Sequence, residues 1–309
     1  MRHLLIGSVA TAVLMGGLPG AQAAAANPTV TIDGSVSTVT TYSLSQLRSM
    51  STTFNVAEPG PLGSQPATEV GVPLESLVTP TVSYPPLTNS KSKSLRVTVT
   101  VRGEGGRAAT FSLGELDPNV GNHLALVSLE RNGIAYPKGP ELVVPGDVNR
   151  FRWVTDVQEL TIGVTPAEHV GPPQSGAVTV QEGRRRAVLS PTLLSLLPAV
   201  TATVSFIGPG GTQTHTESGP PLALVLLVAG DFPGDFPGRN AWVTAVGADD
   251  YAATVTPDEA FVGGRTLILS LNEDHVALTQ PRLIAGGDVK GGRYVSGVDN
   301  LAVGEGPAS

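Results

Sequence analysis

The chain of 309 residues contains no cysteine. It can therefore form no disulfide, offer no thiolate to a metal, and use no cysteine nucleophile or iron–sulfur cluster. Charged residues are also scarce at 15%, whereas hydrophobic residues make up 40%. This balance is typical of a globular chain rather than a disordered one.

A basic excess is missing too, because the formal net charge is -7. Phosphate groups bind to basic surfaces, so the charge argues against a nucleic-acid or anionic-membrane partner. Beyond the N-terminal region, no segment approaches the length of uninterrupted apolar sequence that a membrane span needs. We expect no membrane span, and a small molecule or a protein stays open as partner.

The common catalytic motifs are absent. The sequence holds no G-x-S-x-G, H-E-x-x-H or P-loop, and no G-x-G-x-x-G followed by a helix. After the N-terminal region the histidines are His123, His169, His215 and His275. No two of them have a short metal-ligand spacing, so the sequence predicts no metal site.

The N-terminus has the organisation of an export signal. Arg2 and His3 give a basic start, Leu4–Leu18 is apolar or small, and Ala21–Ala23 supplies an A-x-A cleavage site. The apolar run is too short for a membrane span. Residues 1–23 are therefore predicted to be a Sec signal peptide, which makes the mature protein secreted or periplasmic.

Glycine and proline are abundant, with 37 and 26 residues. Short runs rich in Val and Thr alternate with Gly, Pro, Asp and Asn turns, a texture that favours many strands and few long helices. We therefore predict a strand-rich α+β fold.

The sequence repeats itself. Pro140–Asp147 resembles Pro281–Asp288 at an offset of 288 − 147 = 141, and Trp153–Val157 resembles Tyr294–Val298 at the same offset. Further collinear matches are Ala108–Ser112 with Ala252–Thr256, Gly71–Leu74 with Gly219–Leu222, and Val30–Ile32 with Val178–Val180. Several matches in one order predict a tandem duplication.

The duplication divides the mature chain into two copies. The first copy is predicted to span residues 27–164 and the second residues 176–304. Residues 165–175 form a polar, proline-bearing linker of the kind that separates domains.

Each copy should contain the same elements. A short helix is predicted at Ser43–Met50 and at Ser190–Leu197, with the serine as N-cap, and another should begin at Pro73 or Pro221. The further predicted elements are strands at Thr29–Ile32, Ala177–Gln181, Ser94–Arg102, Ala241–Val246, Leu124–Glu130 and Thr266–Asn272, and helical turns at Ser112–Leu116 and Thr256–Phe261.

The repeated blocks carry a family resemblance. Gly71–Val78 reads G-V-P-L-E-S-L-V, Leu142–Gly146 reads L-V-V-P-G, and Phe151–Val157 reads F-R-W-V-T-D-V. In the second copy, Ala248–Val255 contains a D-D-Y strand and Pro281–Ile284 reads P-R-L-I. In this order the blocks resemble the molybdopterin-binding domain of the sulfite-oxidase-like oxidoreductases. The resemblance implies two tandem domains of that type and a molybdopterin cofactor.

One departure from the family changes the expected function. The family's molybdenum is bound by a cysteine upstream of the G-V-P-L block, but Thr52–Asn55 and Val204–Ile207 contain no thiol there. A hydroxyl is a poor substitute for a soft thiolate. We therefore expect a non-catalytic binding protein. The alternatives are a molybdopterin-dependent oxidoreductase with atypical metal ligation and a structural or surface-interaction module.

Basic residues gather at glycine-rich turns of the second copy. Arg282, Lys290 and Arg293 lie close to Gly286 and Gly287. Backbone amides in such turns, together with fixed cations, can hold a phosphate or a carboxylate. The residues predict either an anion site, which the resemblance equates with the cofactor's phosphate pocket, or a solvated hairpin.

His215 and Glu217 lie just before the Pro220–Pro221 helix start, where the cofactor pocket of the family begins. Glu69 is the counterpart of Glu217 in the first copy. The two residues belong either to a polar pocket or to an exposed loop. The expected ligand is an anionic small molecule or a protein partner, with molybdopterin as the cofactor that the resemblance suggests.

Overall fold

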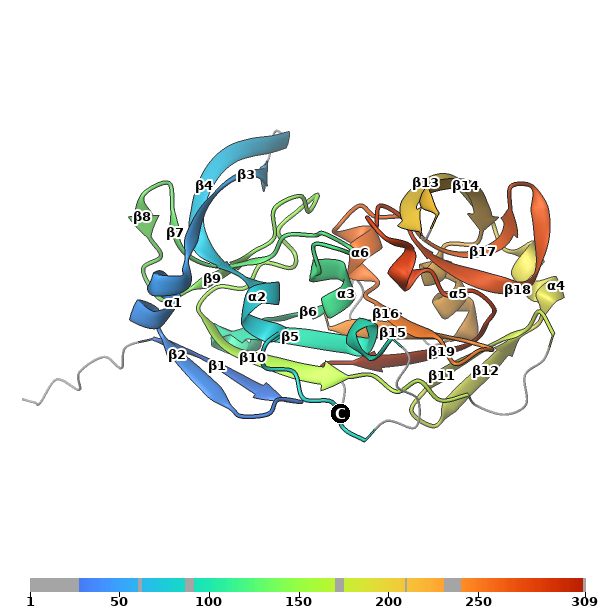
Figure 1. The fold of residues 1–309 in the computed structure, drawn as a ribbon, viewed down its shortest axis with the longest axis horizontal. Helices are drawn as coiled ribbons and strands as arrows, with labels where there is room; N and C mark the ends of the chain where they lie inside the picture. Colours follow the sequence, from blue (N-terminus) through green and yellow to red (C-terminus); the bar gives the residue numbers. More distant parts are fainter. Residues whose placement is uncertain are drawn as a thin grey trace, which may run out of the picture.

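A computed structural model describes residues 28–60, 63–86, 92–169, 175–208, 210–230 and 240–307. The predicted signal peptide, residues 1–23, lies outside the described residues. The described chain forms four sheets with short helices between them (Figure 1), which confirms the strand-rich α+β prediction.

One sheet of the first half mixes parallel and antiparallel strands. Its strands have the order β2-β1-β10-β5-β6, and β1 runs parallel to β10, with Ile32 opposite Leu160. The strands are β1 (Thr29–Gly34), β2 (Thr40–Ser43), β5 (Val97–Gly103), β6 (Ala108–Ser112) and β10 (Val157–Val164).

The second half repeats this sheet strand by strand. The order is β12-β11-β19-β15-β16, and β11 runs parallel to β19, with Val180 opposite Leu301. The strands are β11 (Val178–Glu182), β12 (Arg185–Leu189), β15 (Ala241–Gly247), β16 (Ala252–Val255) and β19 (Val298–Glu305). Two sheets with one topology are what the sequence repeat predicts, although the boundaries 27–164 and 176–304 stay predictions.

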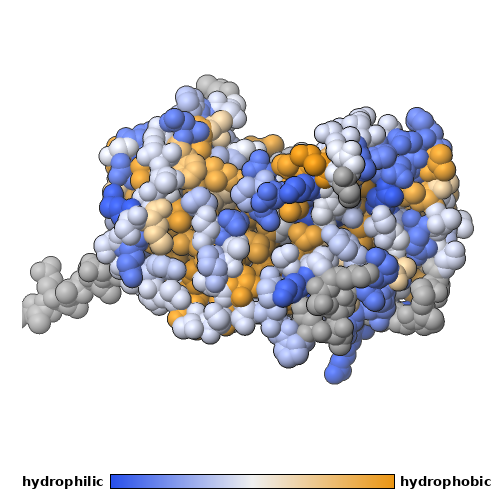
Figure 2. All heavy atoms as spheres, viewed as in Figure 1, coloured by the Kyte–Doolittle hydropathy of each residue, from blue (hydrophilic) through white to orange (hydrophobic). Residues whose placement is uncertain are grey.

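The remaining two sheets are antiparallel. Each contains a long hairpin, and the two hairpins project from the same side of the molecule (Figure 1), with the surface hollowed between them (Figure 2). The first sheet is built from β3 (Thr52–Gly60), β4 (Gly63–Pro73), β7 (Leu126–Arg131), β8 (Ile134–Ala135) and β9 (Glu141–Val143). The second is built from β13 (Val200–Gly208), β14 (Gly211–Gly219), β17 (Leu267–Glu273) and β18 (Val276–Ala285).

The predicted serine caps are present in both halves. Helix α1 (Leu44–Met50) begins with a capping box in which Ser43 Oγ accepts from Gln46 N at 3.3 Å and Gln46 Oε1 accepts from Ser43 N at 2.8 Å. Helix α4 (Pro191–Leu196) begins where Ser190 Oγ accepts from Leu193 N. Each cap satisfies backbone donors that the first helical turn leaves unpaired.

The proline-led helices also form. Pro73 precedes α2 (Leu74–Val78) and Pro221 precedes α5 (Leu222–Ala229). The helical turns are α3 (Leu113–Leu116) and α6 (Asp258–Phe261), and single 3₁₀ turns lie at η1 (Lys93–Arg96), η2 (Glu104–Gly106) and η3 (Gly291–Arg293). The strand expected at Ser94–Arg102 was wrong at its start, because η1 occupies those residues and β5 begins at Val97.

Each half has its own hydrophobic core. In the first, Val99, Phe111 and Leu160 are buried between the two sheets, and in the second Val243 and Leu301 take the equivalent places. Across the described residues, no helix is both long and apolar enough to cross a membrane.

Candidate functional site

Among the described residues, two arginines are completely buried. Arg152 donates from Nε and Nη2 to the carboxylate of Asp147 at 3.0 and 2.6 Å, and from Nη1 to Glu115 Oε1 at 2.6 Å. Burial opposes the charge of the guanidinium, but the two carboxylates outweigh it and raise the pKa of Arg152. His123 lies beside them, with Nδ1 3.0 Å from Glu115 Oε1.

Arg293 repeats this arrangement in the second half. It donates to both oxygens of Asp288 at 2.9 and 2.6 Å and to both oxygens of Glu259 at 2.8 and 2.7 Å. Burial acts against its charge, yet Glu259 and Asp288 raise the pKa of Arg293. Both arginines are thus permanently charged and neutralised by carboxylates of their own half.

The two buried clusters meet at the boundary between the halves. Arg293 Nη1 donates to Ser112 Oγ of the first half at 3.2 Å. Two backbone hydrogen bonds cross the boundary in equivalent places, from Val148 N to Val262 O at 2.7 Å and from Val289 N to Val120 O at 2.6 Å. The clusters therefore join the two halves.

The predicted anion-site residues have different surroundings. Arg282 Nη1 donates to Glu217 Oε1 at 3.1 Å and also to Glu273, and Arg282 Nε donates to Ser296 Oγ. Lys290 is exposed, whereas Arg293 is buried. Anion binding at these residues stays a prediction, but an anion would have to compete with carboxylates that already hold both arginines.

The two glycines of that predicted site lie in the turn before Asp288. Gly286 is buried against Thr266, and Gly287 has a φ of 90°, which a residue with a side chain rarely adopts. The glycines shape the turn that presents Asp288 to Arg293.

His215 and Glu217 lie on β14, beside the carboxylates of β17 and its turn. His215 Nδ1 is 3.0 Å from Asp274 Oδ2 and 3.5 Å from Glu273 Oε1, and the ring stacks on Phe206. Glu217 is buried and binds Arg282. The two residues thus lie on a strand and take part in ionic contacts there, and a polar ligand pocket at these residues stays a prediction.

In the first half, the equivalent network contains two buried carboxylates, Glu58 and Glu69. Glu69, the counterpart of Glu217, is buried and accepts from Ser128 Oγ at 2.6 Å and from Tyr136 Oη at 3.1 Å. Burial and a hydrogen bond with Glu58 raise the pKa of Glu69 to about 7. Glu58 is itself buried and paired with Arg131.

The residues present do not fit a molybdopterin of the sulfite-oxidase type. The stretches that correspond to the family's metal ligand, Thr52–Asn55 and Val204–Ile207, lie in β3 and β13 and contain no thiol. The arginines that could hold its phosphate are paired with carboxylates. Within the described ranges, no three His, Asp or Glu side chains gather in a metal-binding group.

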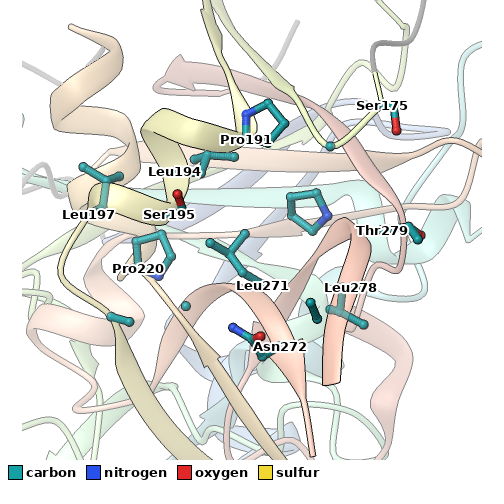
Figure 3. Close-up of a pocket in the computed structure, with 15 residues that line it drawn as sticks. Ser175, Pro191, Leu194, Ser195, Leu197, Pro220, Leu271, Asn272, Leu278 and Thr279 are labelled. Atoms are coloured by element: carbon teal, nitrogen blue, oxygen red, sulfur yellow. The ribbon is translucent and has the colours of Figure 1, made fainter. Parts of the chain in front are cut away.

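An open cavity of about 470 Å³ lies in the second half, between α4, the end of β14 and the β17–β18 hairpin (Figure 3). Leucine and proline side chains from α4 and from the hairpin face one another across it, and Ser195, Asn272 and Thr279 add uncharged polar groups. The lining residues are Ser175, Gly176, Pro191, Leu194, Ser195, Leu197, Ala199, Gly219, Pro220, Leu271, Asn272, Ala277, Leu278, Thr279 and Pro281. None of these is charged. We call this space the α4 cavity.

The first half differs at two positions of this wall. Counting from the equivalent N-caps, Arg48 of α1 corresponds to Ser195 of α4. Glu130 pairs with Ala135 as Asn272 pairs with Ala277, so Glu130 corresponds to Asn272. Arg48 Nη1 and Glu130 Oε2 form an ion pair at 3.5 Å, whereas the second half has only a hydroxyl and an amide.

Sequence reasoning missed the α4 cavity. The signal that could have indicated it is this exchange of two charged residues for two short uncharged ones within the repeat.

Comparisons with known proteins leave the family open. No family profile matches the chain, and no curated protein sequence matches it either. The fold is similar to the crystal structure of the sulfane dehydrogenase SoxCD from Paracoccus pantotrophus, with 15% sequence identity and a TM-score of 0.34. The similarity covers 84% of this chain and 64% of that one, so the chain spans less than two thirds of that protein's length. A resemblance this distant assigns neither family nor activity.

Proposed function

We propose that the protein is an exported, non-catalytic binding protein that holds a small, uncharged, largely apolar molecule in the α4 cavity. Export rests on the predicted signal peptide. The observation that carries the proposal is an open cavity of about 470 Å³ with no charged lining residue, in a chain whose fully buried arginines, Arg152 and Arg293, are paired with carboxylates. A few polar groups in an apolar wall are typical of small-molecule sites.

The chemistry of the wall favours an uncharged ligand over the anionic ligand expected from sequence. An anion needs a cation or several converging donors to offset its desolvation. Ser195, Asn272 and Thr279 can orient a hydroxyl, ether or carbonyl group, while Leu194, Leu271 and other apolar side chains bury the rest.

The first test uses a neutral fluorescent probe. We expect 1-aminoanthracene to bind the mature protein with one-to-one stoichiometry and increased fluorescence. The Ser195→Arg/Asn272→Glu variant places the ion pair of the first half across the α4 cavity and should abolish this binding without unfolding the protein. Thr192→Arg, which adds the arginine alone at an exposed position of α4 outside the cavity, should leave binding unchanged.

The competing functions give different results. Equal probe binding by the wild type and by Ser195→Arg/Asn272→Glu would contradict the α4 site. Stoichiometric molybdenum with a pterin in protein purified from its native host would instead support the oxidoreductase. No thermal stabilisation by any member of a ligand panel, anionic ligands included, would favour a structural or surface-interaction module.

A further inference from the structure

A second cavity, of about 310 Å³, lies in the second half on the other face of the β11–β19–β15 sheet. Val180, Leu301 and Val243 point into the core. Because side chains alternate along strands, Gln181 and Trp242 point to the opposite face. The cavity there is lined by Pro166, Glu168, Gln181, Gly183, Trp242, Asn300, Ala302, Val303, Gly304, Glu305 and Pro307. We call it the linker cavity, because Pro166 and Glu168 belong to the predicted linker.

Two buried polar atoms of this wall have no hydrogen-bond partner among the described residues. They are the indole Nε1 of Trp242 and the amide Oδ1 of Asn300. As whole residues, Trp242 is 7% exposed and Asn300 is 2% exposed. A buried donor or acceptor without a partner is unfavourable and rare in native proteins. Both residues line the linker cavity, so a molecule inside it could supply the missing partners.

The surrounding contacts fix both groups in place. Asn300 Nδ2 donates to the backbone oxygen of Glu168 at 3.1 Å, which leaves its Oδ1 as the open acceptor. The indole of Trp242 rests on Gly304, where an added Cβ would come within 2.3 Å of the ring. A rigid donor and a rigid acceptor are what a preorganised binding site presents.

The pair of groups indicates the chemistry of the ligand. A hydroxyl can accept from the Trp242 indole and donate to the Asn300 amide oxygen at the same time. Glu168 and Glu305 add acceptors for further hydroxyls, and their charge disfavours an anionic ligand. None of the lining residues is a lysine or an arginine.

The first half has no counterpart of these groups. By strand register, Thr98 corresponds to Trp242, Glu159 to Asn300 and Thr161 to Ala302. Arg102 Nη1 donates to Thr161 Oγ1 at 3.0 Å and lies 3.8 Å from Glu159 Oε2. Charged and hydroxyl side chains thus pair with one another on this face in the first half, whereas the second half has Ala302 and an unpaired amide oxygen.

We propose that the linker cavity is a binding site for a neutral, hydroxyl-rich small molecule of monosaccharide size, held by Trp242 Nε1 and Asn300 Oδ1. The site is separate from the α4 cavity and does not depend on the function proposed there. Because Glu168 contributes to its wall, occupancy would also hold the linker segment against the second half.

The experiment follows the indole N–H signals of the ¹⁵N-labelled mature protein. The chain has two tryptophans, and Trp153 Nε1 already donates to Val144 O at 3.3 Å, so its signal serves as an internal control. The probes are D-glucose, D-galactose, D-ribose and myo-inositol, with glucose 6-phosphate as the anionic comparison. We expect at least one neutral probe to shift the Trp242 signal saturably and leave the Trp153 signal in place.

Two variants test the named atoms. Asn300→Leu removes the acceptor and Trp242→Phe removes the donor, and each should weaken binding at least about tenfold, the equivalent of one hydrogen bond. Binding to Trp242→Phe is measured by calorimetry. Glu159→Leu, the matched change in the first half, should leave the affinity unchanged. An unchanged circular dichroism spectrum and melting temperature show that each variant is folded, because Trp153 reports on the first half.

Two results would overturn the proposal. If no neutral probe moves the Trp242 signal at concentrations of tens of millimolar, the linker cavity holds only solvent. If glucose 6-phosphate binds more tightly than glucose, the assignment of a neutral ligand is wrong. Neither result bears on 1-aminoanthracene binding in the α4 cavity.

Discussion

Arg293 of the second half donates to Ser112 of the first half at 3.2 Å, from a position where no part of its side chain reaches solvent. The same guanidinium is held by Asp288 and Glu259. A buried charge with several partners stabilises little in net terms, but removing the charge leaves its partners uncompensated. The boundary between the halves is therefore sensitive to this one side chain.

Arg293→Met should destabilise the protein by about 3–5 kcal/mol, because Asp288 and Glu259 then remain buried without a counter-charge. Urea unfolding followed by circular dichroism measures the change. Arg48→Met removes an ion pair between partly exposed side chains and should cost less than about 1 kcal/mol. Equal effects of the two variants would contradict the role given to Arg293.

The two halves also carry opposite charges at two equivalent positions. Arg131 on β7 lies near Glu141 on β9, and in the second half Glu273 on β17 binds Arg282 on β18. The positions are equivalent, with acid and base reversed. A reversal of this kind preserves the attraction between adjacent strands, with the acid Glu141 of the first half at the place of Arg282 in the second.

The exchange predicts that the pair can be reversed by mutation. Arg282→Glu alone should destabilise the protein by on the order of 2 kcal/mol, because Glu217 and Glu273 then lose their shared arginine and face a third carboxylate. Adding Glu273→Arg should recover at least half of that loss, since the new arginine can bind both acids. A double-mutant cycle from chemical denaturation measures the coupling. A double variant less stable than Arg282→Glu would contradict the equivalence.

Much of the fold could be predicted from the sequence, because its signals are local. Serine caps at Ser43 and Ser190 and prolines at Pro73 and Pro221 act on the first turn of a helix, and all four mark helix starts. The repeat also indicated two similar sets of sheets. These features need no knowledge of distant contacts.

The candidate sites could not be predicted in the same way. Arg293 stands near two glycines, which suggested an anion site, but its surroundings include Ser112 and Glu259 from far along the chain. Both cavities lie where the second half has a smaller or an uncharged side chain in place of the first half's residue, as at Ser195 and Ala302. A single sequence does not show which side chains pair across the fold.

Gly304 is predicted to be necessary for the position of Trp242. A Cβ at residue 304 would lie 2.3–2.8 Å from three atoms of the indole, so Gly304→Ala must displace the ring. We expect a loss of about 1–3 kcal/mol and a red shift in tryptophan emission as Trp242 becomes more exposed. Gly210→Ala adds the same methyl group where nothing lies within 4 Å and should change neither quantity.

Glu69 should make the stability of the protein depend on pH. Its pKa is about 7 in the folded protein and 4.5 ordinarily, so the folded state binds the proton more tightly. The resulting stabilisation is complete below pH 4.5 and is lost as pH rises through 7, by on the order of 3 kcal/mol.

Glu69→Gln keeps a neutral side chain at every pH. It should therefore remove the loss of stability that the wild type shows as pH rises through 7. The variant should melt at a higher temperature than the wild type at pH 8, and the gap should narrow at pH 5. Glu130→Gln changes a more exposed carboxylate on the neighbouring strand and should leave the slope of melting temperature against pH as it is. If Glu69→Gln melts below the wild type at pH 8, the carboxylate is ionised and stabilising there, and the burial of Glu69 beside Glu58 does not govern its charge.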